Sequence, residues 1–218
     1  MRFEQVRIPA ADPDGVGEWY RSRFQSTDST GDGASVRLGE TSLQFTATDT
    51  APPAHLALRL LLDGAAAVDW LTGRATLLPV DGEPSRRFAF LDATAVYFQD
   101  ADDNVLEGLC YDGDPRPAES STVVDGVTEV GLPAHEPLEL VEWLETTVGL
   151  SAWGTPSDTF AWVGDRHARF VVIPTGQEWY PTERVADPAP ITVTVASESA
   201  HPGRHVHPTL PYEIVVDD

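Results

Sequence analysis

The sequence predicts an α+β fold assembled from repeated strand-helix-strand modules, and three observations support this. Short segments with the apolar pattern of strands outnumber helical segments by about three to one. Helices and strands do not alternate regularly, as they would in a doubly wound parallel sheet. Finally, the N-terminal segment recurs in the second half of the chain.

The recurrence is a match without gaps. Residues 5–10 (QVRIPA) align with residues 129–134 (EVGLPA) at a constant offset of 124, and the same offset aligns Trp19 with Trp143. A matched tryptophan beside such a run rarely arises by chance, so we expect an internal duplication.

The duplication predicts two domains. Residues 1–112 are expected to hold two βαβββ modules, and residues 125–218 a second, truncated domain. Residues 113–124 contain turn and loop formers with no apolar period, which is typical of a linker.

The first half is expected to begin with a strand over residues 2–9 that stops at Pro9. A helix follows, capped by Asp12 or Asp14, with Val16, Trp19, Tyr20 and Phe24 at helical spacing. Asp63 is expected to cap a second helix that runs through Leu71. The other strands expected in this half cover residues 34–39, 42–48, 55–61, 86–91, 94–99 and 104–110.

The second half repeats the opening strand and helix. The helix carries Val141, Leu144 and Val148 on one stripe and stops at Gly149. Strands are expected over residues 127–133, 158–163, 168–173, 190–196 and 211–216. Residues 201–210 alone remain for a helix and two strands, so the last module is predicted to be truncated.

Charge excludes some classes of partner. The 218-residue chain carries 35 acidic and 14 basic residues, a formal charge of -21, and all the basic residues are arginine. Nucleic acid and anionic membrane surfaces would be repelled. Because acidic residues are dispersed along the chain, we interpret the charge as adaptation to a salty cytoplasm; a dedicated cationic partner is the alternative.

Other features of the sequence favour a cytoplasmic protein. No apolar run approaches 18 residues, and the N-terminus lacks the apolar region of a signal peptide. The single cysteine, Cys110, cannot form an internal disulfide. We expect a monomer or homodimer with a small-molecule substrate or ligand.

The order of modules and two motifs resemble the vicinal oxygen chelate superfamily, which includes glyoxalase I, bleomycin-resistance proteins and extradiol dioxygenases. Residues 97–107 (YFQDADDNVLE) are similar to the last hairpin of that family, although Ala101 and Asp103 replace its proline and glycine. Residues 53–58 (PAHLAL) are similar to its histidine-bearing strand. The resemblance implies cupped mixed sheets that form two glyoxalase-like domains.

The resemblance also implies a metal site. By strand position, the ligands would be Gln5, Gln44, His55 and Glu107, of which His55 and Glu107 match the family's ligand types. The metal would be a divalent ion (Zn, Ni, Mn or Fe), held weakly because amide oxygens are poor ligands. Iron-dependent oxygen chemistry uses two histidines and a carboxylate, whereas this predicted ligand set has only one histidine, which argues against extradiol cleavage.

The same residues have structural interpretations. His55 could be a core histidine bonded to a backbone carbonyl, and Glu107 could face solvent or pair with Arg7. In the second half Glu129 takes the place of Gln5, Pro190 that of His55 and Glu213 that of Glu107. With no histidine there, we expect no second identical metal centre.

Three further groups carry side chains that could do chemistry. His201, His205 and His207 lie in a Gly/Pro-containing loop and are interpreted as surface histidines, although a metal site or a pocket-closing loop is the alternative. Asp100, Asp102 and Asp103 are expected to form a tight turn, not a calcium loop. Residues 177–182 (QEWYPT) and the other aromatics of the second half pack in the core or line a cleft.

The resemblance predicts a glyoxalase-like, metal-assisted lyase or isomerase that acts on a small oxygenated metabolite, with Glu107 as the proton-transferring group. Two alternatives stay open: a non-catalytic protein that binds a small molecule in the same cup, and a scaffold in which the duplication replaces a dimer. Whether the protein is an enzyme is not decided by the sequence.

Overall fold

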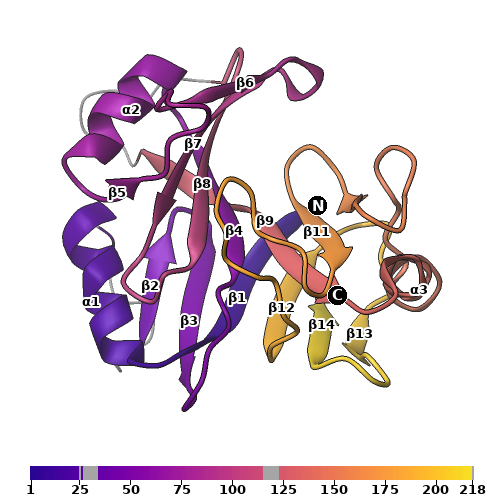
Figure 1. The fold of residues 1–218 in the computed structure, drawn as a ribbon. Helices are drawn as coiled ribbons and strands as arrows, with labels where there is room; N and C mark the ends of the chain where they lie inside the picture. Colours follow the sequence, from indigo (N-terminus) through magenta and orange to yellow (C-terminus); the bar gives the residue numbers. More distant parts are fainter. Residues whose placement is uncertain (25, 27–33, 115–122, 218) are drawn as a thin grey trace.

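The computed structural model describes residues 1–24, 26, 34–114 and 123–217. It is an α+β structure with two mixed sheets, and helices α1 and α2 cover one side of the molecule while α3 lies at the opposite end (Figure 1). Most of the predicted linker, residues 115–122, lies outside the described residues. Within the described ranges, no helix is long and apolar enough to cross a bilayer.

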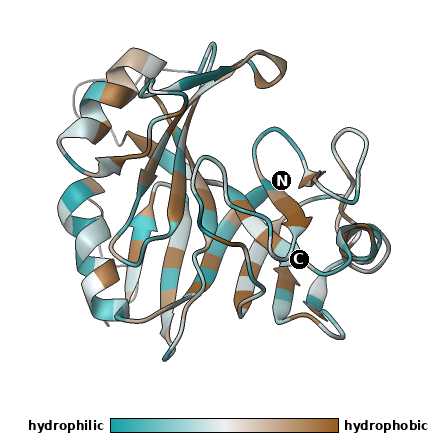
Figure 2. Ribbon diagram, viewed as in Figure 1, coloured by the Kyte–Doolittle hydropathy of each residue, from teal (hydrophilic) through white to brown (hydrophobic). Residues whose placement is uncertain are grey.

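The six-stranded sheet has the order β13-β14-β12-β1-β3-β2. Its strands are β1 (Arg2–Ala10), β2 (Ser35–Leu38), β3 (Thr41–Ala47), β12 (Ile191–Ala196), β13 (Gly203–Val206) and β14 (Tyr212–Val216). β1 pairs in parallel with β3 and antiparallel with β12. Hydrophobic and hydrophilic residues alternate along several of these strands (Figure 2), because one face packs in the core and the other faces outward.

The eight-stranded sheet has the order β10-β11-β9-β4-β8-β7-β5, with β6 paired to β7. Its strands are β4 (His55–Leu60), β5 (Thr76–Leu77), β6 (Arg86–Phe88), β7 (Ala93–Gln99), β8 (Val105–Tyr111), β9 (Val124–Ala134), β10 (Ala161–Gly164) and β11 (Arg169–Pro174). Both faces are largely buried. One face joins the main core with residues such as Leu56 and Phe98, and the other forms a second cluster with Ala57 and Tyr97.

The helices are placed by local signals that the sequence shows. α1 (Pro13–Phe24) begins where the Asp12 carboxylate accepts a hydrogen bond from the Gly15 amide. Asp63 caps α2 (Gly64–Thr72) through the amide of Ala66. α3 (Pro137–Trp143) continues as one π-helical segment, Leu144–Val148, and ends at Gly149 in the left-handed conformation. A 3-10 turn, Ala89–Leu91, follows β6.

Each sheet combines strands from both halves of the chain. The six-stranded sheet joins the first strands, β1 to β3, to the last, β12 to β14 (Figure 1). The eight-stranded sheet joins β4 to β8 from the first half to β9, β10 and β11 from the second. The proposed division at residue 112 therefore describes the repeat in the sequence, whereas the sheets cross it.

The end of the chain differs from expectation in one respect. Among the described residues no helix lies between β12 and β13. However, the prediction that His205 lies in a loop is wrong. Residues 203–206 form strand β13, which pairs antiparallel with β14. Gly203 within this segment obscured its strand pattern.

Candidate metal centre and ligand cavity

Three adjacent strands bring together one histidine and two glutamates. β4 lies between β8 and β9, and its Ala57 is paired in register with Glu107 on one side and with Glu129 on the other. His55 lies two residues before Ala57 and therefore on the same face. The methyl group of Ala57 leaves the space between the two carboxylates open, so all three functional side chains converge above it.

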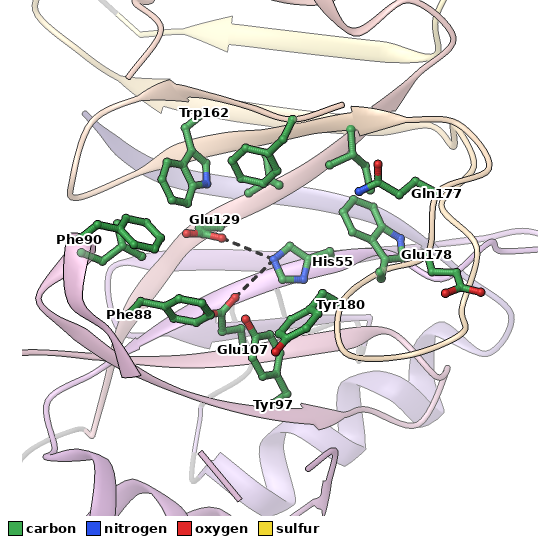
Figure 3. A pocket seen from close by; sticks show the side chains of 15 residues that line it. His55, Phe88, Phe90, Tyr97, Glu107, Glu129, Trp162, Gln177, Glu178 and Tyr180 are labelled. Carbon is green, nitrogen blue, oxygen red and sulfur yellow. Dashed lines mark hydrogen bonds and ion pairs between the residues drawn. The ribbon is translucent and has the colours of Figure 1, made fainter. Parts of the chain in front are cut away.

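The imidazole of His55 faces both carboxylates with the same nitrogen. His55 Nε2 lies 3.5 Å from Glu129 Oε2 and 3.8 Å from Glu107 Oε2 (Figure 3). Both distances are longer than a strong hydrogen bond. His55 Nδ1 is buried without a hydrogen-bond partner among the described residues. His55 is therefore not the core histidine bonded to a backbone carbonyl that was the structural alternative.

Each of the three side chains is buried, and stacking holds the His55 ring in place. Trp179 stacks on it with ring centroids 5.2 Å apart and an interplanar angle of 22°. The indole Nε1 of Trp179 donates a 2.9 Å hydrogen bond to the Pro53 carbonyl. Gly131 permits this packing, because a Cβ there would lie 2.4 Å from the Trp179 ring. The imidazole thus has a fixed direction toward the carboxylates.

Glu129 is divided between two partners. Its Oε1 accepts a hydrogen bond from Arg169, while Oε2 faces His55. Arg169 is fully buried, donates a 2.9 Å hydrogen bond to the Tyr111 hydroxyl, and lies 5.0 Å from the ring centroids of both Trp153 and Trp162. This arrangement leaves Glu129 one oxygen for any further ligand.

The two carboxylates differ in acidity. Burial, reinforced by the neighbouring charge of Glu129, raises the pKa of Glu107 well above its ordinary value, despite the opposing hydrogen bond from Tyr97. Burial is also the largest effect on Glu129 and acts in the same direction, but the charges and hydrogen bonds of Arg169 and His55 together outweigh it, so the pKa of Glu129 is lowered. Glu129 is thus the more acidic member of the pair, and Glu107 the less acidic one.

The donor set fits a divalent metal ion. One ligand atom from each of His55, Glu107 and Glu129 lies within 4.8 Å of the others. Two ligand atoms bound about 2.1 Å from a tetrahedral ion would be about 3.4 Å apart. The distances from His55 Nε2 to the oxygens of Glu129 and Glu107, 3.5 Å and 3.8 Å, are close to this value. Imidazole nitrogen with carboxylate oxygens suits the borderline divalent ions. These three residues would hold such an ion, with Glu129 binding through Oε2 alone.

A cavity of ≈ 510 Å³ opens above the three side chains. Its volume is in the range that small-molecule sites occupy. Phe88, Phe90 and Trp162 lie on one side in Figure 3, Tyr97 and Tyr180 lie on the other, and His55 with the two glutamates lies between them. The segment 177–180 lines this cavity, as the sequence analysis allowed for residues 177–182.

The structure does not bring the predicted Gln5 and Gln44 to this centre. They lie on β1 and β3 of the six-stranded sheet, where Gln44 Nε2 donates a 3.2 Å hydrogen bond to Gln5 Oε1. Arg7 donates to Gln44 Oε1 at 3.0 Å, so it is not a partner of Glu107. Neither glutamine lines the cavity. The predicted four-residue set is divided between two sheets, because β4 and β8 pair with β9 and not with β1.

Glu129 is the member of this three-residue cluster that the sequence did not predict beside His55. The offset of 124 already equated it with Gln5, the expected first-strand ligand. It was not assigned to the site because all four ligands were expected within the first half of the chain. Arg169, which lies beside Glu129 in the β9–β11 register, falls near the position equivalent to Gln44 and carries no other signal in the sequence.

The other candidate groups have structural partners. His201 Nδ1 lies 3.1 Å from the Thr147 carbonyl oxygen, and His205 Nε2 lies 2.7 Å from the His201 carbonyl oxygen. His207 packs against Trp143 with centroids 4.9 Å apart. Among the described residues these histidines form no metal-binding cluster with each other. The buried Asp100 accepts bonds from the backbone amides of residues 102 and 104, which confirms the tight turn.

Comparison with known proteins identifies the fold. No protein-family model and no curated protein matches the sequence. The structure superposes on a Bacillus subtilis protein proposed to be a dioxygenase, with a TM-score of 0.59, 15% identity, and coverage of 100% of this chain and 85% of that chain. Glyoxalase I from Zea mays gives a TM-score of 0.53 at 12% identity, with coverage of 100% and 92%. Since these identities are low, the likeness establishes the architecture. The protein therefore has the fold of the vicinal oxygen chelate superfamily, to which the sequence motifs pointed.

Proposed function

We propose that this protein is a metal-assisted lyase or isomerase of glyoxalase type that acts on a small oxygenated molecule in the aromatic cavity. The observation that carries the proposal is the convergence of three buried side chains, His55, Glu107 and Glu129, on the floor of that cavity. A divalent ion bound there would polarise two neighbouring oxygens of the substrate as a Lewis acid.

Glu107 is the group proposed to move a proton. It lines the cavity, so a substrate carbon above the floor is within its reach. A carboxylate in this position can accept a proton from carbon and return it to the neighbouring carbon. The Tyr97 hydroxyl hydrogen-bonds this carboxyl and restricts its orientation.

We propose that Glu129 and His55 are fixed in position as ligands and transfer no protons. The ion pair with Arg169 favours the ionised form of Glu129, and stacking on Trp179 fixes the direction of the His55 ring. The apolar lining limits access of water to the floor, which strengthens electrostatic interactions there.

The experiment is proton exchange on a neutral compound with two neighbouring oxygens. The protein, loaded in turn with Zn, Ni, Mn or Fe(II), is incubated in D₂O with 2-hydroxy-1-phenylpropan-1-one, and loss of the carbinol C–H signal is followed by NMR. We expect exchange that slows by about 10²- to 10⁴-fold in Glu107→Gln. Glu178→Gln, at an exposed residue of the same cavity, is the matched control. Absence of exchange with all four ions, despite bound metal, would contradict the proposal.

One observation favours a second candidate function. Seven of the fifteen residues that line the cavity are aromatic, which suits retention of a ligand without chemistry. A protein that binds the aryl ketone but leaves its carbinol proton unexchanged would support this binding function in place of the enzyme.

A further inference from the structure

The cavity has two aromatic sides that enclose the glutamates and the histidine. The first side consists of Phe88, Phe90, Phe160 and Trp162. Phe90 contacts both Phe88 and Trp162, and Trp162 also contacts Phe160, with ring centroids 5.0–5.8 Å apart. The second side is formed by Tyr97, Trp179 and Tyr180, and Tyr97 packs edge-on against Tyr180 at 5.5 Å. Rings on both sides offer planar surfaces to a flat ligand.

Several of these rings are exposed although they are large and apolar. Phe90 is 67% exposed, Tyr180 50% and Phe160 39%. All three line the cavity, so the exposed apolar surface is continuous with its interior. An apolar ligand would cover this surface, and the area removed from water would contribute to binding.

The lining contains acidic groups and no basic side chain of arginine or lysine among the described residues. Glu107 and Glu129 lie at the floor, and the exposed Glu178 also lines the cavity. The guanidinium of Arg169 is fully buried, lies outside the lining, and donates hydrogen bonds to Glu129 and Tyr111. A ligand carboxylate or phosphate would therefore have no arginine to pair with inside the cavity.

The cost of an anionic ligand has two parts. A charge moved from water into an apolar site without a partner pays a large desolvation penalty. The formal charge of -21 and the glutamates of the lining add like-charge repulsion during approach. A neutral planar molecule incurs neither cost.

From these features we infer that the cavity without a metal ion selects neutral, planar aromatic molecules and rejects ligands of the same shape that carry an anionic group. The inference rests on the proposed function in that the ligand occupies the same cavity. It extends that function by naming the class of ligand and the features that determine it: the two aromatic sides and the absence of arginine and lysine from the described lining.

The test compares two ligands that share a ring system. 2-Acetylnaphthalene is neutral, whereas 2-naphthoate places a carboxylate at the same position. Binding of each to metal-free protein is measured by quenching of tryptophan fluorescence. We expect the ketone to bind at least 10-fold more tightly than the naphthoate. Equal or tighter binding of the naphthoate, or no binding of either, would overturn the inference.

Substitutions then locate the two determinants. Tyr180→Leu should weaken binding of the ketone by about 2- to 10-fold, and Tyr180→Phe should retain it, because the ring supplies the contact. Gln177→Arg introduces a cation at an exposed residue of the lining and should strengthen binding of the naphthoate selectively. Ser199→Arg adds the same charge at an exposed residue outside the lining and should leave both affinities unchanged. Equal effects of the two arginine substitutions would contradict a role for the lining.

This test separates the inference from the proposed function. It uses protein without metal and measures binding alone, so a failure of catalysis does not affect it. Conversely, if the naphthoate binds well to a protein that exchanges carbinol protons, the inference fails while the proposed function stands.

Discussion

Arg169 and Glu129 form an ion pair that is sealed inside the protein at the edge of the proposed metal centre. The guanidinium occupies one carboxylate oxygen and leaves the other directed at His55. Trp153 and Trp162 lie over the guanidinium, and Trp162 also lines the ligand cavity. One buried arginine thus links the charge of the centre to the aromatic side of the cavity.

Loss of Arg169 should be strongly destabilising. Arg169→Leu leaves the Glu129 carboxylate buried without its cation, and we expect a loss of about 3–5 kcal/mol in the free energy of unfolding. Urea unfolding of metal-free protein measures it. Arg204→Leu removes the exposed arginine paired with Glu213 and should change the free energy of unfolding far less than Arg169→Leu does. The double variant Arg169→Leu/Glu129→Gln should recover much of the loss; equal stability of the single and double variants would contradict this account.

Removal of the Glu107 charge should stabilise the metal-free protein at neutral and alkaline pH. Because its folded-state pKa is raised, Glu107 contributes stability below its ordinary value, and that contribution is lost as the pH rises through the raised pKa. The free energy of unfolding of Glu107→Gln should therefore rise relative to that of the wild type between pH 5 and pH 8, by about 1–3 kcal/mol at pH 8. Urea unfolding across this range gives the difference.

The control for this prediction is Glu178→Gln, which changes an exposed carboxylate of the same cavity. Its difference from the wild type should show no comparable rise with pH. A Glu107→Gln difference that stays constant from pH 5 to pH 8 would mean that the Glu107 carboxyl is not held in the environment described.

Gly131 should not tolerate even a methyl group. A Cβ at this position would lie 2.4 Å from the Trp179 ring and 3.1 Å from His55 Cβ. We expect Gly131→Ala to cost about 1–3 kcal/mol through overpacking and to weaken metal binding through displacement of the imidazole. Thermal unfolding and metal titration measure the two effects.

Gly73 provides a comparison of opposite sign. Its backbone is in the right-handed helical region with φ -83°, and nothing lies within 4 Å of the position that a Cβ would take there. Gly73→Ala should be neutral or stabilise the protein by up to about 1 kcal/mol, through the unfolded state. If Gly131→Ala behaved in the same way, the close packing of Trp179 over the centre would be refuted.

Most elements of the fold could be predicted because their signals are local. Asp12 and Asp63 cap their helices, Gly149 ends the third, and four of the six residues of the strand over residues 55–60 are apolar. The strand over residues 203–206 was not predicted. It lies at a sheet edge and is largely exposed, so burial imposes little alternation of apolar and polar residues on its sequence.

The site could be predicted only in part, because strand pairing between distant segments has no local signal. His55 and Glu107 were found from motifs within one module. Glu129 joins them only because β9 pairs with β4, a contact between the two halves. Gln5 aligns with Glu129 in the repeat, but its strand, β1, pairs with β12 in the other sheet.

Metal titration of protein stripped with EDTA tests the central claim most directly. We predict that the wild type binds one equivalent of a divalent ion (Zn, Ni, Mn or Fe(II) in turn) by calorimetry. His55→Ala and Glu129→Gln should each weaken binding by more than the roughly 10- to 100-fold that loss of an outer partner causes. The double variant Gln5→Ala/Gln44→Ala and the exposed-residue control His135→Ala should bind like the wild type. Binding that survives His55→Ala, or that disappears in the glutamine double variant, would contradict a centre built from His55, Glu107 and Glu129.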